Sequence, residues 1–186
     1  MRVISGSARR VHLTAPKGLN TRPTADMAKE SLFNIISAEI HGVRFLDLFC
    51  GSGAIGLEAL SRGAREAVFV ENAKPAIAAT LQNIEKTKLA QYAKLLEMPA
   101  EKAINTLDAS GSSFDIIFLD PPYDTNLLTQ TLNHLARTSL LCETGIIIAE
   151  TDSKSHEASP IPTPSVFELT GTRIYGRTCF LFFTWI

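Results

Sequence analysis

The segment Asp120-Pro121-Pro122-Tyr123 places a carboxylate, two prolines and an aromatic ring in direct succession. It ends the apolar run Phe114–Asp120, which is typical of a buried strand in a parallel sheet. Because proline cannot donate to a ladder, the strand should stop here and leave its carboxylate at the carboxyl end, where open α/β sheets bind ligands. The fixed proline φ angles would hold carbonyl oxygens and the tyrosine ring in one arrangement. Such a site suits a planar group with an exocyclic NH2, such as a nucleobase.

A second candidate site lies upstream, where Phe45–Gly56 should run from a strand through a glycine-rich turn into a helix. Gly51, Gly53 and Gly56 fit the spacing G-x-G-x-x-G, and Glu71 follows at the end of the next expected strand. Taken alone, this pattern is the fingerprint of a dinucleotide-binding site.

Asp47 argues for a different ligand with a ribose. It lies within the strand before the turn, where a carboxylate would repel a pyrophosphate but could face the amino group of an amino-acid moiety. S-adenosylmethionine fits this position, with Glu71 accepting hydrogen bonds from both ribose hydroxyls. The alternative for Glu71 is an acid at a strand end in solvent. For the segment Asp120–Tyr123, the alternative is a plain Pro-Pro turn.

The composition indicates one soluble domain. The chain has 186 residues, is 45% hydrophobic, and contains no apolar run near the ~18 residues of a membrane span. Its first residues lack the apolar core of a signal peptide, so a cytoplasmic location is expected. Three widely spaced cysteines favour reduced thiols over a disulfide frame, and the four histidines show no metal-ligand spacing. We therefore expect neither a metal nor a membrane partner.

The charge distribution favours an RNA-binding arm, although the net charge of −1 does not. Basic residues precede the first acid, Asp26, without any acid among them: Arg2, Arg9, Arg10, Lys17 and Arg22. A neutral body with such an arm can still bind phosphates locally. Arg9, Arg10 and Lys17 are the candidate RNA contacts, and a solvated basic face is the alternative.

Expected strands and helices alternate from Arg44 onward, which indicates a doubly wound parallel α/β sheet. The expected strands are Arg44–Phe49, Ala67–Glu71, Ala93–Glu97, Phe114–Asp120 and Gly145–Glu150. The helices between them are Ile55–Ser61, Pro75–Lys88, Ala100–Leu107 and Asn126–Leu140. Two last strands, near Val166–Arg173 and Thr178–Trp185, should form an antiparallel hairpin at the edge.

The first residues should fold as a second, smaller hairpin. Two short strands, Arg2–Ser5 and Arg10–Thr14, are expected around Gly6-Ser7. A polar loop at 15–24 follows, and Thr24 should cap a helix that reaches about residue 40.

Nearly the whole chain resembles the bacterial 16S rRNA guanine-N2 methyltransferases of the RsmD type, whose family name specifies guanine 966. The glycine loop and Asp-Pro-Pro-Tyr are shared with many amino-methyltransferases, whereas Asn20–Thr24 is specific to this family. The resemblance rests on Met1–Gly6, Pro16–Thr24, Leu46–Ala64, Asp120–Tyr123 and Tyr175–Thr178.

The resemblance implies a Rossmann-like class I methyltransferase fold with a seven-stranded, mostly parallel sheet. It implies S-adenosylmethionine as donor and 16S rRNA, in an assembling or assembled 30S subunit, as substrate for a monomer. Residues 1–24 would form the RNA-binding arm and cofactor-covering loop, and 25–186 the methyltransferase domain. By position, the cofactor would contact Thr21, Arg22, Thr24, Asp47, Phe49, Gly51, Ser52, Gly53, Glu71, Asn72, Pro99, Ala100 and Asp120.

One position departs from the family pattern. The family usually has Asp or Asn before an alanine at the end of the third strand, to bind the adenine amino group, and here Pro99 precedes Ala100. Pro99 offers neither a side-chain acceptor nor an N–H. The adenine would depend on the Ala100 N–H, on apolar packing, or on a carboxylate such as Glu97 or Glu101.

The expected catalytic residues are Asp120, Pro121, Pro122 and Tyr123. Asp120 and the Pro121 carbonyl would accept hydrogen bonds from the guanine NH2, and Tyr123 would stack on the base. An adenine-N6 or cytosine-N4 DNA methyltransferase uses the same logic, but no target-recognition domain is recognisable. A NAD-dependent oxidoreductase and a non-catalytic RNA-binding module are the alternatives from other classes.

Overall fold

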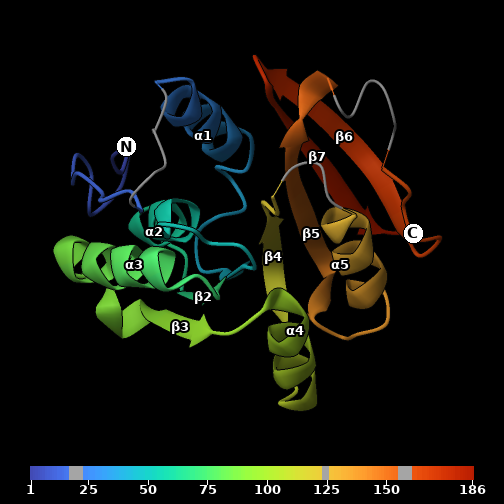
Figure 1. Cartoon of the computed structure of the whole chain (residues 1–186). Helices are drawn as coiled ribbons and strands as arrows, with labels where there is room; N and C mark the ends of the chain where they lie inside the picture. Colours follow the sequence, from blue (N-terminus) through green and yellow to red (C-terminus); the bar gives the residue numbers. More distant parts are fainter. Residues whose placement is uncertain (17–22, 123–125, 155–160) are drawn as a thin grey trace.

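The computed structural model describes residues 1–16, 23–122, 126–154 and 161–186 (Figure 1). Within these residues the strands are β1 (Arg44–Asp47), β2 (Glu66–Glu71), β3 (Ala93–Glu97), β4 (Phe114–Leu119), β5 (Leu141–Asp152), β6 (Phe167–Tyr175) and β7 (Thr178–Trp185). The helices are α1 (Pro23–Ile35), α2 (Ala54–Ser61), α3 (Lys74–Thr87), α4 (Ala100–Ala109) and α5 (Leu127–Leu135), with a 3-10 turn η1 (Ala90–Tyr92).

The strands form one seven-stranded sheet in the order β3-β2-β1-β4-β5-β7-β6. Strands β1 to β5 pair in parallel, whereas β7 pairs antiparallel with both β5 and β6. This arrangement confirms the predicted doubly wound sheet with an antiparallel hairpin at its edge. The strand order reverses between β1 and β4, and the crevice at such a switch point is where these sheets bind ligands.

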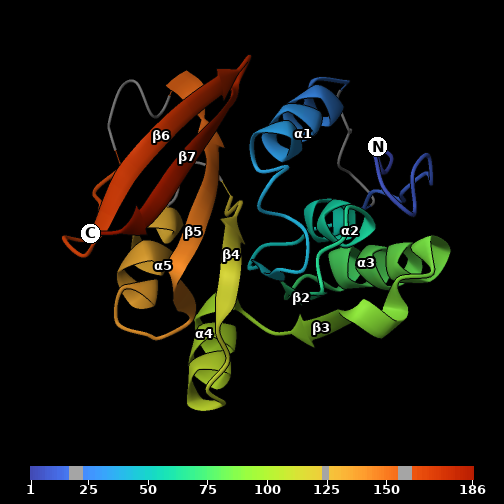
Figure 2. The same ribbon diagram turned by 180° about the vertical axis from the view of Figure 1, so that it is seen from behind.

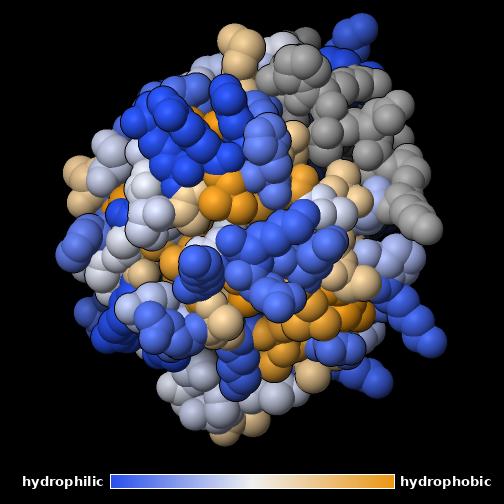
Figure 3. Space-filling view, turned by 90° about the vertical axis from the view of Figure 1, so that its left-hand side faces the viewer, coloured by the Kyte–Doolittle hydropathy of each residue, from blue (hydrophilic) through white to orange (hydrophobic). Residues whose placement is uncertain are grey.

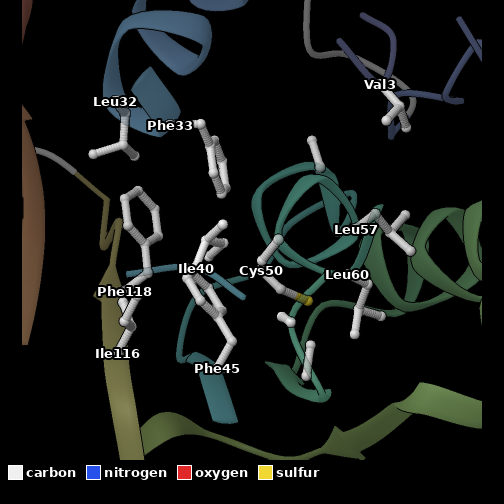
Figure 4. Close-up of a cluster of buried hydrophobic side chains, with 14 of the residues drawn as sticks. Val3, Leu32, Phe33, Ile40, Phe45, Cys50, Leu57, Leu60, Ile116 and Phe118 are labelled. Atoms are coloured by element: carbon white, nitrogen blue, oxygen red, sulfur yellow. The ribbon is translucent and has the colours of Figure 1, made fainter. Parts of the chain in front are cut away.

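Side chains alternate between the two faces of the central strands, and each face packs into its own hydrophobic cluster. Phe45 of β1 and Phe118 of β4 belong to a cluster shared with α1 and α2. Figure 4 shows Leu32 of α1 pointing toward Phe118 in this cluster. Leu46 and Ile117, the chain neighbours of Phe45 and Phe118, point to the other face and pack with α4 and α5. The sheet is therefore covered on both faces, as its uninterrupted apolar strands require.

Helix α1 lies between α2 and the C-terminal hairpin, which is clearest from behind (Figure 2). It contacts both β6 and β7. Its residues Ala28 and Lys29 line a cavity together with Asp47 at the end of β1. The helix therefore extends one wall of the crevice at the switch point.

The N-terminal arm doubles back as predicted but does not form the two expected strands, Arg2–Ser5 and Arg10–Thr14. A single antiparallel bridge joins Arg2 and His12. The arm also packs against the body, because its residues Val3, Ala8 and Leu13 are buried in the same hydrophobic cluster as α2. The division into an arm at 1–24 and a domain at 25–186 stays a prediction.

Side chains of α2 explain why no ladder forms in the arm. The backbone N–H groups of Ile4 and Ser5 donate to the Glu58 carboxylate at 2.7 and 3.0 Å. Gly6 follows with φ 84°, and a Cβ there would lie 1.7 Å from the carbonyl oxygen of Ser61. The backbone donors of Ile4 and Ser5 are therefore bound to α2 and not to the second expected strand, and only glycine fits the close approach at position 6.

Some helix and strand ends differ from those expected. Helix α1 begins at Pro23, so Thr24 lies inside its first turn and is not the cap, and it ends at Ile35 instead of near residue 40. Helix α5 ends at Leu135 instead of Leu140, where the hydroxyl of Thr138 bonds the Leu135 carbonyl at 2.9 Å. Strand β5 is correspondingly longer than predicted. Local hydrogen bonds of this kind compete with helix continuation and are hard to anticipate from apolar periodicity.

The surface that carries the arm and α3 is shown in Figure 3. Hydrophilic residues cover much of this face, and apolar residues form patches between them. In the part of the chain that the structure describes, no helix is long and apolar enough to cross a membrane. The same residues contain no group of three His, Cys, Asp or Glu side chains placed to hold a metal ion.

Candidate active site at the carboxyl ends of the strands

Two carboxylates meet at the switch point of the sheet. Asp47 is the last residue of β1, and Asp120 directly follows β4. The two strands are neighbours, with Asp47 opposite Phe118 in the register. The structure thus brings together residues that are 73 positions apart in the sequence (120 minus 47), as the prediction of two adjoining sites requires.

Two cavities open at this edge and share Phe49, Gly51 and Asp120. The first has a volume of about 240 Å³ and lies between the glycine loop, α1 and the ends of β4, β5 and β7. The second has a volume of about 570 Å³ and extends past the end of β2 toward α4 and α5. Its lining includes Leu48, Val70, Glu71, Asn72, Met98, Ala100, Pro121, Pro122 and Leu127. An elongated ligand with two dissimilar ends would fill both.

Asp47 is fully buried and only partly satisfied. Its Oδ2 accepts a hydrogen bond from the Gly56 N–H at 3.3 Å, whereas its Oδ1 has no partner among the described residues. Burial raises the pKa of this carboxyl to about 7, and the nearby charge of Glu71 also raises it. The backbone hydrogen bonds to the carboxylate lower the pKa, but by less than burial raises it. An unsatisfied buried acceptor of this kind is suited to a donor brought by a ligand.

Asp120 lies among other acids. Burial, the charge of Glu150 and the charge of Asp47 together raise its pKa well above the usual range of an aspartate. Glu150, near the end of β5, lines the smaller cavity and accepts a hydrogen bond from the Thr178 hydroxyl at 3.3 Å. Four carboxylates of the described residues therefore line one cavity, those of Asp26, Asp47, Asp120 and Glu150. A positively charged ligand would relieve their repulsion.

Glu71 faces the glycine loop. One of its carboxylate oxygens accepts from the Gly51 N–H at 3.0 Å. The other accepts from the N–H groups of Asn72 and Ala73 at 2.8 and 2.9 Å. The side chain is thus held at the rim of the larger cavity by three backbone donors.

The third glycine of the loop has a packing role. A Cβ on Gly56 would lie 2.4 Å from a ring carbon of Phe69, so α2 can approach β2 only because this residue has no side chain. This is the part that the last glycine of a G-x-G-x-x-G pattern plays in close helix–strand contact.

Helix α3 supports the loop with two buried polar side chains that sequence reasoning did not identify. The Thr80 hydroxyl donates to the Gly51 carbonyl at 2.8 Å, and the Asn83 amide donates to the Ser52 carbonyl at 2.9 Å. Both residues are 0% exposed. Their spacing of three places them on one face of the helix, which is the signal that sequence analysis could have used.

Pro99 and Ala100 stand at the start of α4, where Pro99 is the N-cap residue. They line a further pocket of about 450 Å³ with Asn72, Glu101 and His134, among others. The first N–H groups of a helix lack intrahelical acceptors. Of the two carboxylates proposed to replace the missing acceptor, Glu101 lies in this pocket, whereas Glu97 does not line any of the cavities described here.

Some predicted site residues lie outside the described residues, and others are described but do not line these cavities. Lys17, Thr21, Arg22 and Tyr123 lie outside the described residues, as does the side chain of Thr24. Arg9 and Arg10 are exposed on the arm and do not line the cavities. Ser52 and Phe49 do line the smaller cavity, while Gly53, at the start of α2, does not.

Most residues that line the smaller cavity were not predicted as site residues, among them Met1, Lys29, Glu150 and Phe180. Lys29 is the least expected, because a lysine is rarely buried without a partner. Its ammonium lies 3.5 Å from Glu58 and donates to the Arg2 carbonyl at 2.6 Å. Burial lowers the pKa of Lys29 despite the acids nearby.

Comparison with known proteins gives consistent matches over the whole chain. A family model described as "Conserved hypothetical protein 95" matches residues 1–184. The Bacillus subtilis (strain 168) protein named "Putative rRNA methyltransferase YlbH" is 38% identical, over 95% of this chain and 99% of that protein. The Escherichia coli (strain K12) protein named "Ribosomal RNA small subunit methyltransferase D" is 32% identical, over 97% of this chain and 87% of that protein.

A solved structure shares the fold. The structure titled "Putative methyltransferase yhhF from Escherichia coli" has a TM-score of 0.86 and 30% sequence identity. The match covers 100% of this chain and 97% of that one. The seven-stranded sheet and the antiparallel edge described above therefore recur in a protein of known structure.

Proposed function

The chain belongs to the family described as "Conserved hypothetical protein 95", which confirms the predicted resemblance, and we propose that it methylates the N2 atom of a guanine in 16S rRNA. S-adenosylmethionine is the methyl donor in this proposal, and S-adenosylhomocysteine is the product. The proposal rests on the carboxylates Asp47, Asp120 and Glu150 around one cavity at the switch point. A dinucleotide would bring its anionic pyrophosphate to this place, whereas S-adenosylmethionine brings two positive groups, an ammonium and a sulfonium.

The unsatisfied oxygen of Asp47 supports this fit. An ammonium donor would give Oδ1 the hydrogen bond that it lacks among the described residues. Glu71, held by three N–H groups at the rim of the larger cavity, has capacity left to accept from ribose hydroxyls. Ala100 and Met98 supply apolar walls further along, where an adenine would lie.

Asp120 is the residue we assign to the reacting amine. When bound, S-adenosylmethionine supplies a methyl group already activated by its sulfonium, so the protein has to orient the nucleophile. The guanine N2 lone pair is delocalised into the ring. Hydrogen bonds from the NH2 to Asp120 and to the Pro121 carbonyl would localise that lone pair and stabilise the developing positive charge. The carboxylate can take the proton afterwards.

Recognition of the base requires it to leave its helix. A guanine that is stacked and paired cannot reach the crevice, so the target must be looped out or flipped. Pro121 and Pro122 fix the backbone at the wall of the larger cavity. We keep the assignment of Tyr123 as the stacking residue, which is part of the proposal.

The arm is the proposed RNA contact. Arg9 and Arg10 are exposed at its turn, and neither forms an ion pair among the described residues. Lys17 follows in the chain and belongs to the same proposal. Changing Arg9 and Arg10 together to Ala should make the slope of log K against log salt shallower by roughly 1.4–1.8 if each contacts a phosphate. An unchanged slope would assign the RNA contact to another surface.

In vitro methylation tests the proposed function. Purified 30S subunits and free 16S rRNA should be incubated with labelled S-adenosylmethionine, digested to nucleosides and analysed by mass. We expect N2-methylguanosine from at least one of the two substrates, and little product from the variant Asp120→Ala. Label on adenine or cytosine would contradict the guanine assignment. Absence of label from both substrates, in a protein that retains S-adenosylhomocysteine, would contradict RNA methylation itself.

A further inference from the structure

Asn83 joins two parts of the molecule that have different proposed ligands. Its amide donates to the Ser52 carbonyl in the glycine loop and to the Thr14 carbonyl in the arm, both at 2.9 Å. Its Oδ1 accepts from the Thr14 N–H at 2.7 Å. The side chain is 0% exposed, so water does not compete for these bonds. One amide group therefore bonds the end of the arm directly to the glycine loop, in addition to the bonds that hold the arm to α2.

The linkage extends from the cofactor cavity to the exposed arginines. Ser52 lines the smaller cavity, and its hydroxyl also lies 3.6 Å from the Met1 sulfur. Within the arm, the Leu13 N–H donates to the Met1 carbonyl at 3.1 Å. The Arg10 N–H donates to the Val3 carbonyl at 2.9 Å. Displacement of Thr14 would thus be transmitted along the arm to Arg10.

We propose that Asn83 is a positioning residue that couples RNA binding at the arm to occupation of the cofactor cavity. The inference rests on the proposed function, because it takes S-adenosylmethionine and RNA as the two ligands. A ligand that orders the glycine loop fixes the Ser52 carbonyl, and this carbonyl holds the Asn83 amide in place. The Asn83 amide in turn holds the backbone N–H and carbonyl of Thr14. An arm ordered in this way presents Arg9 and Arg10 to phosphates with less entropy left to lose.

Thr80 provides the matched control. It lies one turn before Asn83, is equally buried, and donates to the Gly51 carbonyl in the same loop. No hydrogen bond of Thr80 reaches the arm among the described residues. Thr80→Val should weaken cofactor binding by loosening the loop and should leave the coupling unchanged. Asn83→Asp keeps the shape and an acceptor for Thr14, but it loses both donors.

The measurement is the affinity of the full chain for a 16S rRNA transcript, with and without saturating S-adenosylhomocysteine. For the unchanged protein we expect S-adenosylhomocysteine to tighten RNA binding about fivefold or more, within the usual range of coupling. This ratio of RNA affinities with and without S-adenosylhomocysteine is the coupling factor. RNA should tighten S-adenosylhomocysteine binding by the same factor, because coupling is reciprocal. For Asn83→Asp the factor should fall below about 2, whereas Thr80→Val should retain it. A factor of 1 in the unchanged protein, or an unchanged factor in Asn83→Asp, would overturn the proposal.

A second measurement needs no variant and covers the case in which Asn83→Asp does not fold. Hydrogen exchange of the Thr14 amide, followed by NMR, should slow severalfold when S-adenosylhomocysteine is added. The Arg44 amide, which donates to Asp115 at the opposite end of the sheet, should not respond. An unchanged Thr14 rate would refute the coupling. Failure of the unchanged protein to bind either ligand would instead count against the proposed function.

Discussion

Carboxylates stand at both ends of the parallel strands, and their surroundings are opposite. At the amino ends, Glu66 forms an ion pair with Arg44, and Asp115 accepts the Arg44 backbone N–H at 2.7 Å. At the carboxyl ends, neither Asp47 nor Asp120 has an ion-pair partner among the described residues. The pKa of both is raised, and burial is the main cause.

In our proposal, the difference separates acids that serve the fold from acids that serve a ligand. The paired acids at the amino ends are balanced within the protein itself. Asp47 and Asp120 at the carboxyl ends reduce the stability of the free protein, because burying a charge without an ion-pair partner is unfavourable. A site where several groups have pKa values shifted by burial and by one another is characteristic of function.

The largest effect is expected at Asp120. Asp120→Ala should lower kcat by roughly two to three orders of magnitude, as removal of one electrostatic stabiliser does. S-adenosylmethionine affinity should stay within severalfold, because the proposed role concerns the guanine NH2. Steady-state kinetics with saturating RNA, combined with calorimetric titration of the cofactor, would separate the two quantities. A kcat near that of the unchanged protein would assign the base contact to another group.

Asp47→Asn should have opposite effects on binding and on stability. Loss of the charged hydrogen bond should weaken S-adenosylmethionine binding about 10- to 100-fold. Removal of the buried charge should raise the free energy of unfolding of the free protein by roughly 1–3 kcal/mol at pH 8. Calorimetric titration and urea unfolding measure these two changes. A variant that is weaker in binding and also less stable would show that Asp47 serves the fold.

In the unchanged protein, stability and cofactor affinity should likewise change in opposite directions with pH. Burial raises the pKa of Asp47 from 3.8 to about 7 in the folded state. Its contribution to stability is therefore complete below pH 3.8 and is lost as the pH rises through about 7. Cofactor affinity should change in the other direction, weakening about tenfold for each pH unit below 7, because the protonated carboxyl cannot pair with an ammonium. Titration across this range should show both trends, and Asp47→Asn should weaken both.

The sequence predicted the parts of the site that depend on local pattern. The glycine spacing at Gly51–Gly56, the strand that ends at Asp120 and the alternation of strands and helices all follow from neighbouring residues. Because the carboxyl ends of parallel strands meet at one edge, Asp47, Glu71 and Asp120 could be expected near each other. The raised pKa values of Asp47 and Asp120, and the orphaned oxygen of Asp47, depend on burial, which only the packed structure supplies.

The contacts that sequence reasoning missed connect residues far apart in the chain. Glu58 bonds the backbone of Ile4 and Ser5, and Asn83 bonds that of Thr14, across separations that no local pattern encodes. The bonds to Glu58 take two backbone donors of the first expected strand, while Val3 and Leu13 still donate across the arm. Glu150 carried a weak signal as an acid near a strand end, comparable to Glu71, and that signal was not used.

The smallest effect is expected where a carboxylate is already paired. Glu66→Gln makes the same chemical change as Asp47→Asn, at the other end of the same sheet. The ion pair with Arg44 is partly exposed, with 27% and 39% of the two side chains accessible. Loss of such a pair should lower the free energy of unfolding by less than about 1 kcal/mol. Arg44 also retains its position over the Phe114 ring, 5.1 Å from the centroid.

Glu66→Gln should also leave kcat, cofactor affinity and their pH dependence unchanged, because the residue lies at the edge opposite the crevice. Urea unfolding of the two amide variants side by side tests the comparison directly. We expect a small loss of stability for Glu66→Gln and a gain for Asp47→Asn at pH 8. If both variants lost stability, the buried charge of Asp47 would be stabilised within the protein itself. The carboxylates at the carboxyl ends would then no longer indicate a cationic ligand.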